Sequence, residues 1–228
     1  VYDYQGNKFF DFCLNQGSII LGHHPTPLSK SLKNHLSLGI PFSGQHLKKQ
    51  VQNSILKFYP QYQEVAFFFS TPHLLSFLEK ELKSPVFNLG YKTLREESIL
   101  YQDPFLLLSP AIANGFPMCA LLSKKPILLQ EDPIPDIFYQ SAKTTLSEVK
   151  KNFFKKEINS LLAPYQKEIA LYGHGIFKIK GLSLNQKIAL YLKEKKILIS
   201  PQQEYFFLAK QTEPHQIAYL FKVLKKMP

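Results

Sequence analysis

The sequence predicts a mixed α/β protein, and two kinds of pattern support this class. Short continuous apolar runs, such as "VAFFF" and "FLLL", are typical of strands that are buried on both faces. Longer segments repeat apolar residues every three or four positions, which indicates amphipathic helices. A chain of 228 residues is long enough for one large domain or two small ones with a buried core.

The first sixty residues predict a turn and then two helices. A turn signal between aromatic residues favours a short strand pair over 1–12. The first helix is expected over 26–39, with Thr26 as its N-cap and Gly39 at its end. The second helix is expected over 46–60, where a proline ends it.

The middle of the chain contains four strand-like runs. A short helix is expected after the first run, opening at Thr71 and Pro72. Between the last two runs, Asn114 and Gly115 predict a tight turn that Pro117 closes. The four runs cover residues 64–70, 85–92, 104–109 and 118–123.

The last part of the chain reads as a compact module in which helices flank short strands. The pattern is helical over 144–165, and two strands about a Gly-His-Gly turn are expected over 168–181. The remaining expected elements are a helix over 185–196, strands over 197–201 and 204–210, and a helix over 213–227.

The net charge of +11 suggests a nucleic-acid partner, but the distribution of the lysines argues against one. They occur in short runs along expected helices, often beside glutamate, as on a solvated helix face. A basic nucleic-acid-binding module is kept as an alternative.

The two cysteines, Cys13 and Cys119, lie in apolar contexts and not at a metal-ligand spacing, which favours a reducing, cytoplasmic location. The sequence shows no apolar run long enough to span a membrane and no signal-peptide pattern. His23 and His24 are adjacent and lack a third ligand nearby in sequence, so no metal site is expected.

Five segments, taken in order, resemble the class III pyridoxal-phosphate-dependent aminotransferases, especially the glutamate-1-semialdehyde aminomutases. "VYDYQGNKFFDF" resembles their opening "DxDGNxYxDF", and "GSIILGHHPTPLSKSL" resembles "GxxxLGHxHPxVxxAL". "SPAIANGFPMCAL" is similar to the "GKALANGxPxxA" block that holds the catalytic lysine. The segment before Ser70 is similar to the one that leads into the "SGTEA" phosphate loop, and residues 188–224 resemble the closing small domain.

The resemblance implies a reduced version of the fold type I transferases, with a mostly parallel large-domain sheet and a small α+β domain from both chain ends. The large domain is expected over 46–143 and the small domain over 1–45 plus 144–228. Typical members are longer, so the large-domain sheet is expected to be cut down. The resemblance also implies a dimer, either of this chain or with a full-length aminotransferase paralogue.

The same resemblance places Pro110 at the position of the catalytic lysine. Proline has no side-chain amine, so it cannot form a Schiff base with the coenzyme. The neighbours are Ser109 and Ala111, so a shift of one residue does not restore the amine. The Asn-Gly turn is therefore expected to be a scaffold that remains after the reactive group was lost.

The other positions that the resemblance assigns are also altered. Asn88 replaces the aspartate that keeps the pyridine nitrogen of the coenzyme protonated. Ser70 matches the phosphate loop. The phosphate threonine that a partner subunit contributes in the family aligns near Ala142, and a small shift of the alignment leaves Thr144 or Thr145 as the candidates. Asn15 and Gln16 match substrate-pocket residues. Ser70, Asn88 and Thr144 are therefore interpreted as vestigial cofactor-binding residues, and Asn15 and Gln16 as vestigial substrate-binding residues.

These observations predict a pseudoenzyme, a non-catalytic dimeric protein with a structural or regulatory role and no cofactor. One alternative is a residual transaminase that binds pyridoxal phosphate without its own lysine or together with a partner subunit.

Overall fold

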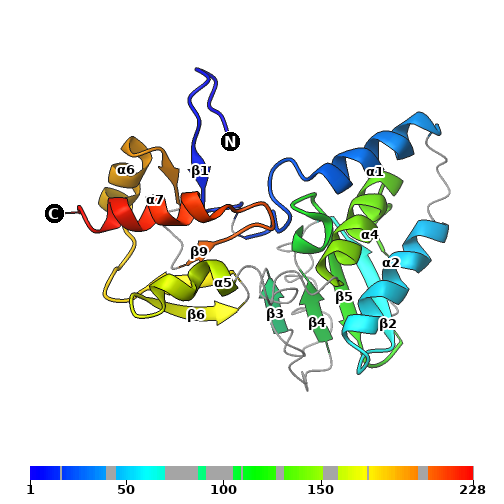
Figure 1. Ribbon diagram of the computed structural model, residues 1–228. Helices are drawn as coiled ribbons and strands as arrows, with labels where there is room; N and C mark the ends of the chain where they lie inside the picture. Colours follow the sequence, from blue (N-terminus) through cyan, green and yellow to red (C-terminus); the bar gives the residue numbers. More distant parts are fainter. Residues whose placement is uncertain are drawn as a thin grey trace. The chain divides into compact units, whose positions relative to one another are not determined.

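The structure is a computed structural model that describes ten stretches of the chain. They are residues 1–15, 17–39, 45–69, 87–90, 105–108, 110–126, 131–150, 159–173, 175–199 and 205–227. The chain divides into two compact units (Figure 1). One unit is continuous over His24–Lys151, and the other combines Val1–His23 with Asn152–Pro228. The expected domain limits, after residues 45 and 143, both fall inside the continuous unit.

The continuous unit contains a four-stranded sheet in the order β2-β5-β4-β3 among the described residues. Strand β5 is antiparallel to both of its neighbours, whereas β3 and β4 are parallel. Strands β2, β3 and β4 therefore run in one direction, and their carboxyl ends lie at one edge of the sheet. The strands are β2 (Glu64–Phe68), β3 (Phe87–Gly90), β4 (Phe105–Leu108) and β5 (Cys119–Ser123).

The apolar runs that predicted these strands form the core of the sheet. Leu106, Leu107 and Leu108 of β4 are fully buried, and every residue of β5 is buried. Neither face of these strands is solvated, which explains why their sequences lack polar alternation.

The described part of this unit also contains three long helices, namely α1 (Thr26–Ser37), α2 (Gln45–Phe58) and α4 (Asp136–Lys150). Helix α4 packs against α1 and α2, and α2 also packs on β2. The prediction that Thr26 is an N-cap is wrong, because Pro25 occupies the cap and Thr26 is already helical. Gly39 follows the C-cap with a φ of +69°, a conformation that favours glycine at a helix end.

Helix α4 begins eight residues earlier than the helical pattern at 144 indicated, directly after Pro135. A proline is well placed immediately before a helix because its missing N–H has no intrahelical partner there. The buried side chains of Tyr139, Ala142 and Leu146 form the apolar face of this helix.

Among its described residues, the discontinuous unit contains two small sheets and three α-helices. Strand β1 (Phe10–Asp11) pairs in parallel with β8 (Ile197–Leu198), which joins the two ends of the chain. Strands β6, β7 and β9 form an antiparallel sheet, so the strand pair predicted over 168–181 is present. The other elements are β6 (Ile169–Gly173), β7 (Ile176–Ile179), β9 (Phe206–Phe207), α5 (Asn159–Leu162), α6 (Gln186–Glu194) and α7 (Pro214–Leu224).

Aromatic side chains make up much of the core of this unit. The Phe177 ring stacks on Phe206 at 5.3 Å and lies 6.4 Å from Phe221 of α7. A capping box between Glu213 and Gln216 begins α7. Within the described ranges, no helix has the length and apolar character that crossing a membrane requires.

Candidate functional site

The carboxyl edge of the larger sheet is the candidate site, because ligands of open α/β sheets bind beyond the carboxyl ends of their strands. Asn88 lies on β3 and pairs with Leu107 of the parallel strand β4. Pro110 comes two residues after β4 and begins the short 3-10 helix η1 (Pro110–Ala113). Asn88 therefore lies on one of two neighbouring parallel strands, and Pro110 follows the carboxyl end of the other. Ser70 lies outside the described residues, and β2 ends at Phe68.

The predicted Asn-Gly turn is present, although η1 separates it from β4. Asn114 and Gly115 have φ angles of 51° and 88°, both in the left-handed region. The turn is closed by the Phe116 N–H, which donates to the Ala113 carbonyl oxygen at 3.2 Å. The segment then enters β5, which pairs back with β4.

Helix α4 holds this turn in place through a hydrogen bond and an aromatic contact. The Ser141 hydroxyl is fully buried and donates to the Ala113 carbonyl oxygen at 2.8 Å. One turn earlier on α4, the Phe138 ring lies 5.3 Å from the ring of Phe116 and 6.0 Å from the ring of Phe69. The end of β2 and the turn before β5 therefore contact the same helix.

The described residues do not fit a coenzyme that is tethered through an imine at Pro110. Pro110 has no side-chain amine. The next lysines along the chain, Lys124 and Lys125, follow β5, whose last residue pairs with the first residues of β2 and β4. Lys124 and Lys125 therefore lie near the amino-terminal ends of β2 and β4, at the edge of the sheet opposite the candidate site. Lys48 lies at the outer side of β2, where it forms an ion pair with Glu131.

Thr144 lies on α4, and its hydroxyl takes part in the contact with α1. Its Oγ1 is 2.9 Å from Ser31 Oγ and 3.0 Å from the Gln140 carbonyl oxygen. The neighbouring positions Ala142 and Thr145 are fully buried.

Asn15 belongs to the discontinuous unit, where it follows Leu14 with a φ of 48°. Its carbonyl oxygen accepts hydrogen bonds from the Ser18 hydroxyl at 2.7 Å and the Ser18 N–H at 3.2 Å. Gln16 lies outside the described residues.

Asp11 organises the loop that contains Asn15, and the sequence analysis missed this role. One carboxylate oxygen accepts the N–H groups of Cys13 and Leu14 at 2.7 and 3.0 Å. The other lies 2.6 Å from His23 Nε2. Burial acts to raise the pKa of Asp11, but the hydrogen bonds from His23 and from the two backbone N–H groups outweigh it and lower the pKa.

The two adjacent histidines have separate partners. His23 bonds to Asp11, whereas His24 Nδ1 lies 3.1 Å from Ser29 Oγ at the start of α1. In the stretches that the structure describes, no group of three histidine, cysteine or acidic side chains could hold a metal ion.

A second feature that the sequence did not reveal is the covered outer edge of β2. The Phe67 N–H donates to Glu131 Oε1 at 3.0 Å, and the Asp132 N–H donates to the Phe67 carbonyl oxygen at 3.2 Å. The Phe69 N–H donates to Asp132 Oδ2 at 2.8 Å. Tyr139 packs edge-on against Phe67, and burial together with nearby acidic groups raises its pKa. Because these groups satisfy an exposed strand edge, they oppose pairing with other chains.

No family model and no curated protein matches this chain. Solved aminotransferases do share its fold. An ornithine aminotransferase from Plasmodium yoelii matches with a TM-score of 0.71 at 11% identity, covering 99% of this chain and 90% of that chain. An omega-transaminase from Sphaerobacter thermophilus matches with a TM-score of 0.76 at 11% identity, covering 97% and 87%.

A third structure is a glutamate-1-semialdehyde aminomutase from Pseudomonas aeruginosa, a lysine-to-alanine variant in complex with PMP. It matches with a TM-score of 0.74 at 8% identity, covering 99% of this chain and 84% of that chain. At these identities the likeness shows the fold alone. The predicted α/β fold of the pyridoxal-phosphate-dependent aminotransferases is therefore confirmed.

Proposed function

We propose that this chain is an aminotransferase-like protein that does not catalyse transamination by itself and that acts as a dimeric structural or regulatory protein. The observation that carries the proposal is Pro110 at the start of η1, beyond the carboxyl end of β4. This is the position at which the sequence resemblance places the catalytic lysine.

The chemistry of transamination supports this reading. A lysine amine is needed to form the Schiff base and to move protons, and a carboxylate is needed to keep the ring nitrogen protonated. Pro110 supplies no amine, and the neutral amide at Asn88 cannot stabilise a positive charge as a carboxylate does. Loss of both groups removes the nucleophile and weakens the electron sink.

The test is to add pyridoxal phosphate, record the absorbance of the imine, reduce with borohydride and map any adduct by peptide mass spectrometry. We expect the native chain to give no stoichiometric adduct. A Pro110→Lys variant should gain an adduct on the peptide that contains residue 110, whereas Pro110→Ala should not. A stoichiometric adduct on any lysine of the native chain would overturn the proposal.

A second function, non-covalent coenzyme binding, is favoured by one comparison. A protein of the same fold that bears a lysine-to-alanine substitution was solved with PMP. The loss of a lysine is therefore compatible with PMP binding in this fold. Calorimetry with PMP separates the two proposals, because saturable binding without a borohydride-trapped adduct supports the second one.

The proposed dimer forms either between two copies of this chain or with a full-length aminotransferase. Analytical ultracentrifugation tests the first case, and co-expression with affinity capture of a tagged aminotransferase tests the second.

A further inference from the structure

Strand β6 forms one edge of the antiparallel sheet in the described part of the discontinuous unit. Beside the start of this strand, the Lys180 N–H donates to the Glu168 carbonyl oxygen at 2.8 Å. Hydrogen-bonded and non-hydrogen-bonded pairs alternate along an antiparallel ladder, so Ala170 also bonds to β7. The backbone N–H and carbonyl groups of Ile169 and Leu171 therefore face away from β7, towards the outer edge.

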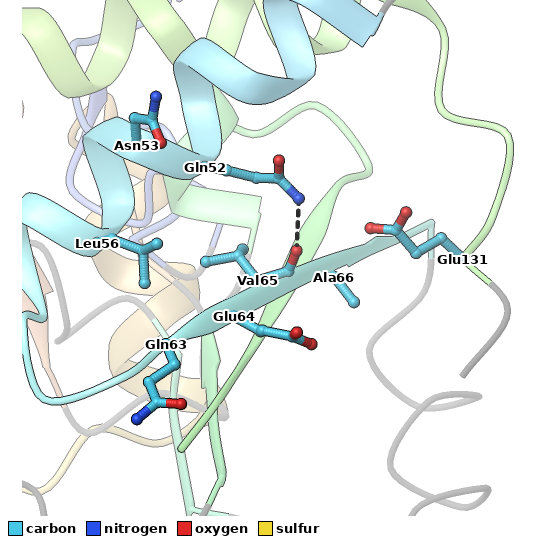
Figure 2. A pocket seen from close by; sticks show the side chains of 8 residues that line it. All are labelled: Gln52, Asn53, Leu56, Gln63, Glu64, Val65, Ala66 and Glu131. Atoms are coloured by element: carbon cyan, nitrogen blue, oxygen red, sulfur yellow. Dashed lines mark hydrogen bonds between the residues drawn. The ribbon is translucent and has the colours of Figure 1, made fainter. Parts of the chain in front are cut away.

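Two other strand edges are covered by the chain itself. On β9, the Phe207 N–H donates to the Phe12 carbonyl oxygen at 3.0 Å. On β2, the Gln52 side-chain amide donates to the Val65 carbonyl oxygen at 2.8 Å, and Glu131 lies beside the same strand (Figure 2). Among the hydrogen bonds between described residues, none reaches the outer edge of β6. This edge therefore differs from the other two in offering its backbone groups for pairing.

The apolar layer of the sheet is partly open at the same edge. Leu171 lies opposite Phe177, so both side chains are on the face where Phe177 packs against Phe221 of α7. Phe177 is fully buried, whereas Leu171 is 47% exposed. The next residue, Tyr172, is 41% exposed. A strand added beside β6 would therefore bury an apolar side chain against Leu171.

The other face of the sheet carries positive charge near this edge. Lys178 follows Phe177 in β7 and therefore lies on the opposite face, where its Nζ is 5.4 and 4.7 Å from the centroids of two tyrosine rings. Lys167 before β6 and Lys180 after β7 are exposed. The sequence over 165–181 contains one acidic residue, Glu168. An acidic segment is attracted to such an edge, whereas a second copy of the same basic edge is repelled.

We propose that the outer edge of β6 binds an extended segment of a partner protein in which apolar and acidic residues alternate. The backbone of the segment pairs with Ile169 and Leu171, as in β-strand addition. Because side chains alternate between the two faces of a strand, its apolar residues cover Leu171 while its acidic residues approach Lys178. The inference goes beyond the proposed function and does not depend on it.

The experiment titrates the full chain with a blocked peptide, VEVEV, which has the five residues of β6, and follows the amide groups by NMR. We expect saturable shifts at Ile169 and Leu171. The same peptide N-methylated at every residue keeps the side chains but has no N–H donors, so it should give no such shifts. The peptide VKVKV keeps the backbone and reverses the charge, and it should bind about tenfold more weakly.

Variants of the chain separate the contribution of the backbone from that of the side chains. Leu171→Pro removes an outward-facing N–H without removing a bond to β7, so binding should be lost. Leu171→Ala is its matched control, because it keeps the N–H and loses only apolar contact, and it should weaken binding about fivefold.

The charge is tested in the same way. Lys178→Met should weaken binding of VEVEV about fivefold, the size of effect expected from an exposed ion pair. Lys222→Met changes an exposed lysine on α7 of the same unit and should leave binding unchanged.

Slow exchange of the Lys178 N–H, which faces β6, shows whether Leu171→Pro keeps the ladder. If this variant does not fold, the N-methylated peptide on the native chain still decides the question. The proposal is overturned if VEVEV gives no saturable shifts at Ile169 and Leu171, if either control peptide binds equally well, or if folded Leu171→Pro keeps the native affinity. Shifts of these amides with a uridine oligonucleotide instead, or with protein concentration alone, would also overturn it, because nucleic acid or a second copy would then occupy the edge.

Discussion

At the scale of single residues, Asp11 is expected to stabilise the fold through its hydrogen bonds. Its carboxylate is largely buried and bonds to His23 and to two backbone N–H groups, while the loop beyond it holds Leu14 and Asn15 in the left-handed region. We expect Asp11→Asn to lower the free energy of unfolding at neutral pH by about 1–3 kcal/mol, because hydrogen bonds to a charged acceptor are lost. Urea unfolding followed by circular dichroism measures this change.

Asp3→Asn is the matched control for that substitution. Asp3 also accepts backbone and side-chain hydrogen bonds, from Gln5 and Asn7, but it is less buried than Asp11. Solvent screening should make its effect much smaller. Equal losses for the two variants would contradict the role assigned to Asp11.

The lowered pKa of Asp11 also predicts the pH dependence of this difference. In the unfolded chain the Asp11 carboxylate has the ordinary aspartate pKa of about 3.9 and binds a proton below it. In the folded state the same carboxylate stays ionised to a lower pH. The stabilisation is therefore complete above the unfolded pKa and is lost as the pH falls through the folded pKa. Unfolding measured at neutral pH and below about pH 3 should show the native and Asp11→Asn curves converging in acid. A difference that grows in acid would contradict this assignment.

At the scale of elements, the edge of β2 gives a residue-specific prediction. The Phe67 and Phe69 N–H groups face the outer edge, while those of Ala66 and Phe68 face β5, because N–H directions alternate along a strand. Asp132→Ala should therefore speed amide exchange of Phe69 by about tenfold through the loss of one hydrogen bond. Exchange of Phe68 should change little. Hydrogen exchange monitored by NMR tests this, and uniform acceleration along β2 would indicate unfolding of the strand instead.

The hydrogen bond between Ser141 of α4 and Ala113 of η1 gives a second prediction at this scale. Ser141→Ala removes the buried hydrogen bond to the Ala113 carbonyl oxygen, which still accepts the Phe116 N–H at 3.2 Å. We expect a loss of about 1 kcal/mol in the free energy of unfolding. Ser37→Ala removes a hydrogen bond of the same chemistry on the exposed end of α1 and should stay within about 0.5 kcal/mol of the native protein. Chemical denaturation of both variants measures these free energies of unfolding. A loss for Ser141→Ala no larger than that for Ser37→Ala would mean that the Ser141 hydrogen bond does not stabilise the fold.

Most elements were predictable because their signals are local. Apolar runs gave β2, β4 and β5, and apolar spacing with proline and glycine signals gave α1 and α2 within a few residues. The start of α4 and the cap of α1 were misplaced, since prolines at 25 and 135 shift where each helix begins. Local signals are weakest at such boundaries.

The contacts that shape the sites were not predictable from local patterns. Glu131 bonds to Phe67 across 64 positions of sequence, and His23 reaches Asp11 across 12. Neither pair has a spacing that marks it as a contact, because tertiary packing alone brings the partners together. The significance of Pro110 could be predicted only because its segment resembles the block that holds the catalytic lysine in the aminotransferases. The Asn114–Gly115 turn beside it carries no reactive side chain that would mark a site.

At the scale of the whole molecule, the net charge of +11 lets salt distinguish the proposed dimer from the nucleic-acid alternative. Two copies of a basic chain repel each other, so salt that screens this repulsion should strengthen self-association. Binding to a polyanion changes in the opposite direction, because salt reduces the gain from counterion release. Sedimentation velocity at micromolar concentration should therefore show a dimer whose fraction is unchanged or rises between low and physiological salt. A monomer at both salts, with RNA or DNA binding that weakens steeply as salt rises, would replace the dimer proposal with the nucleic-acid one.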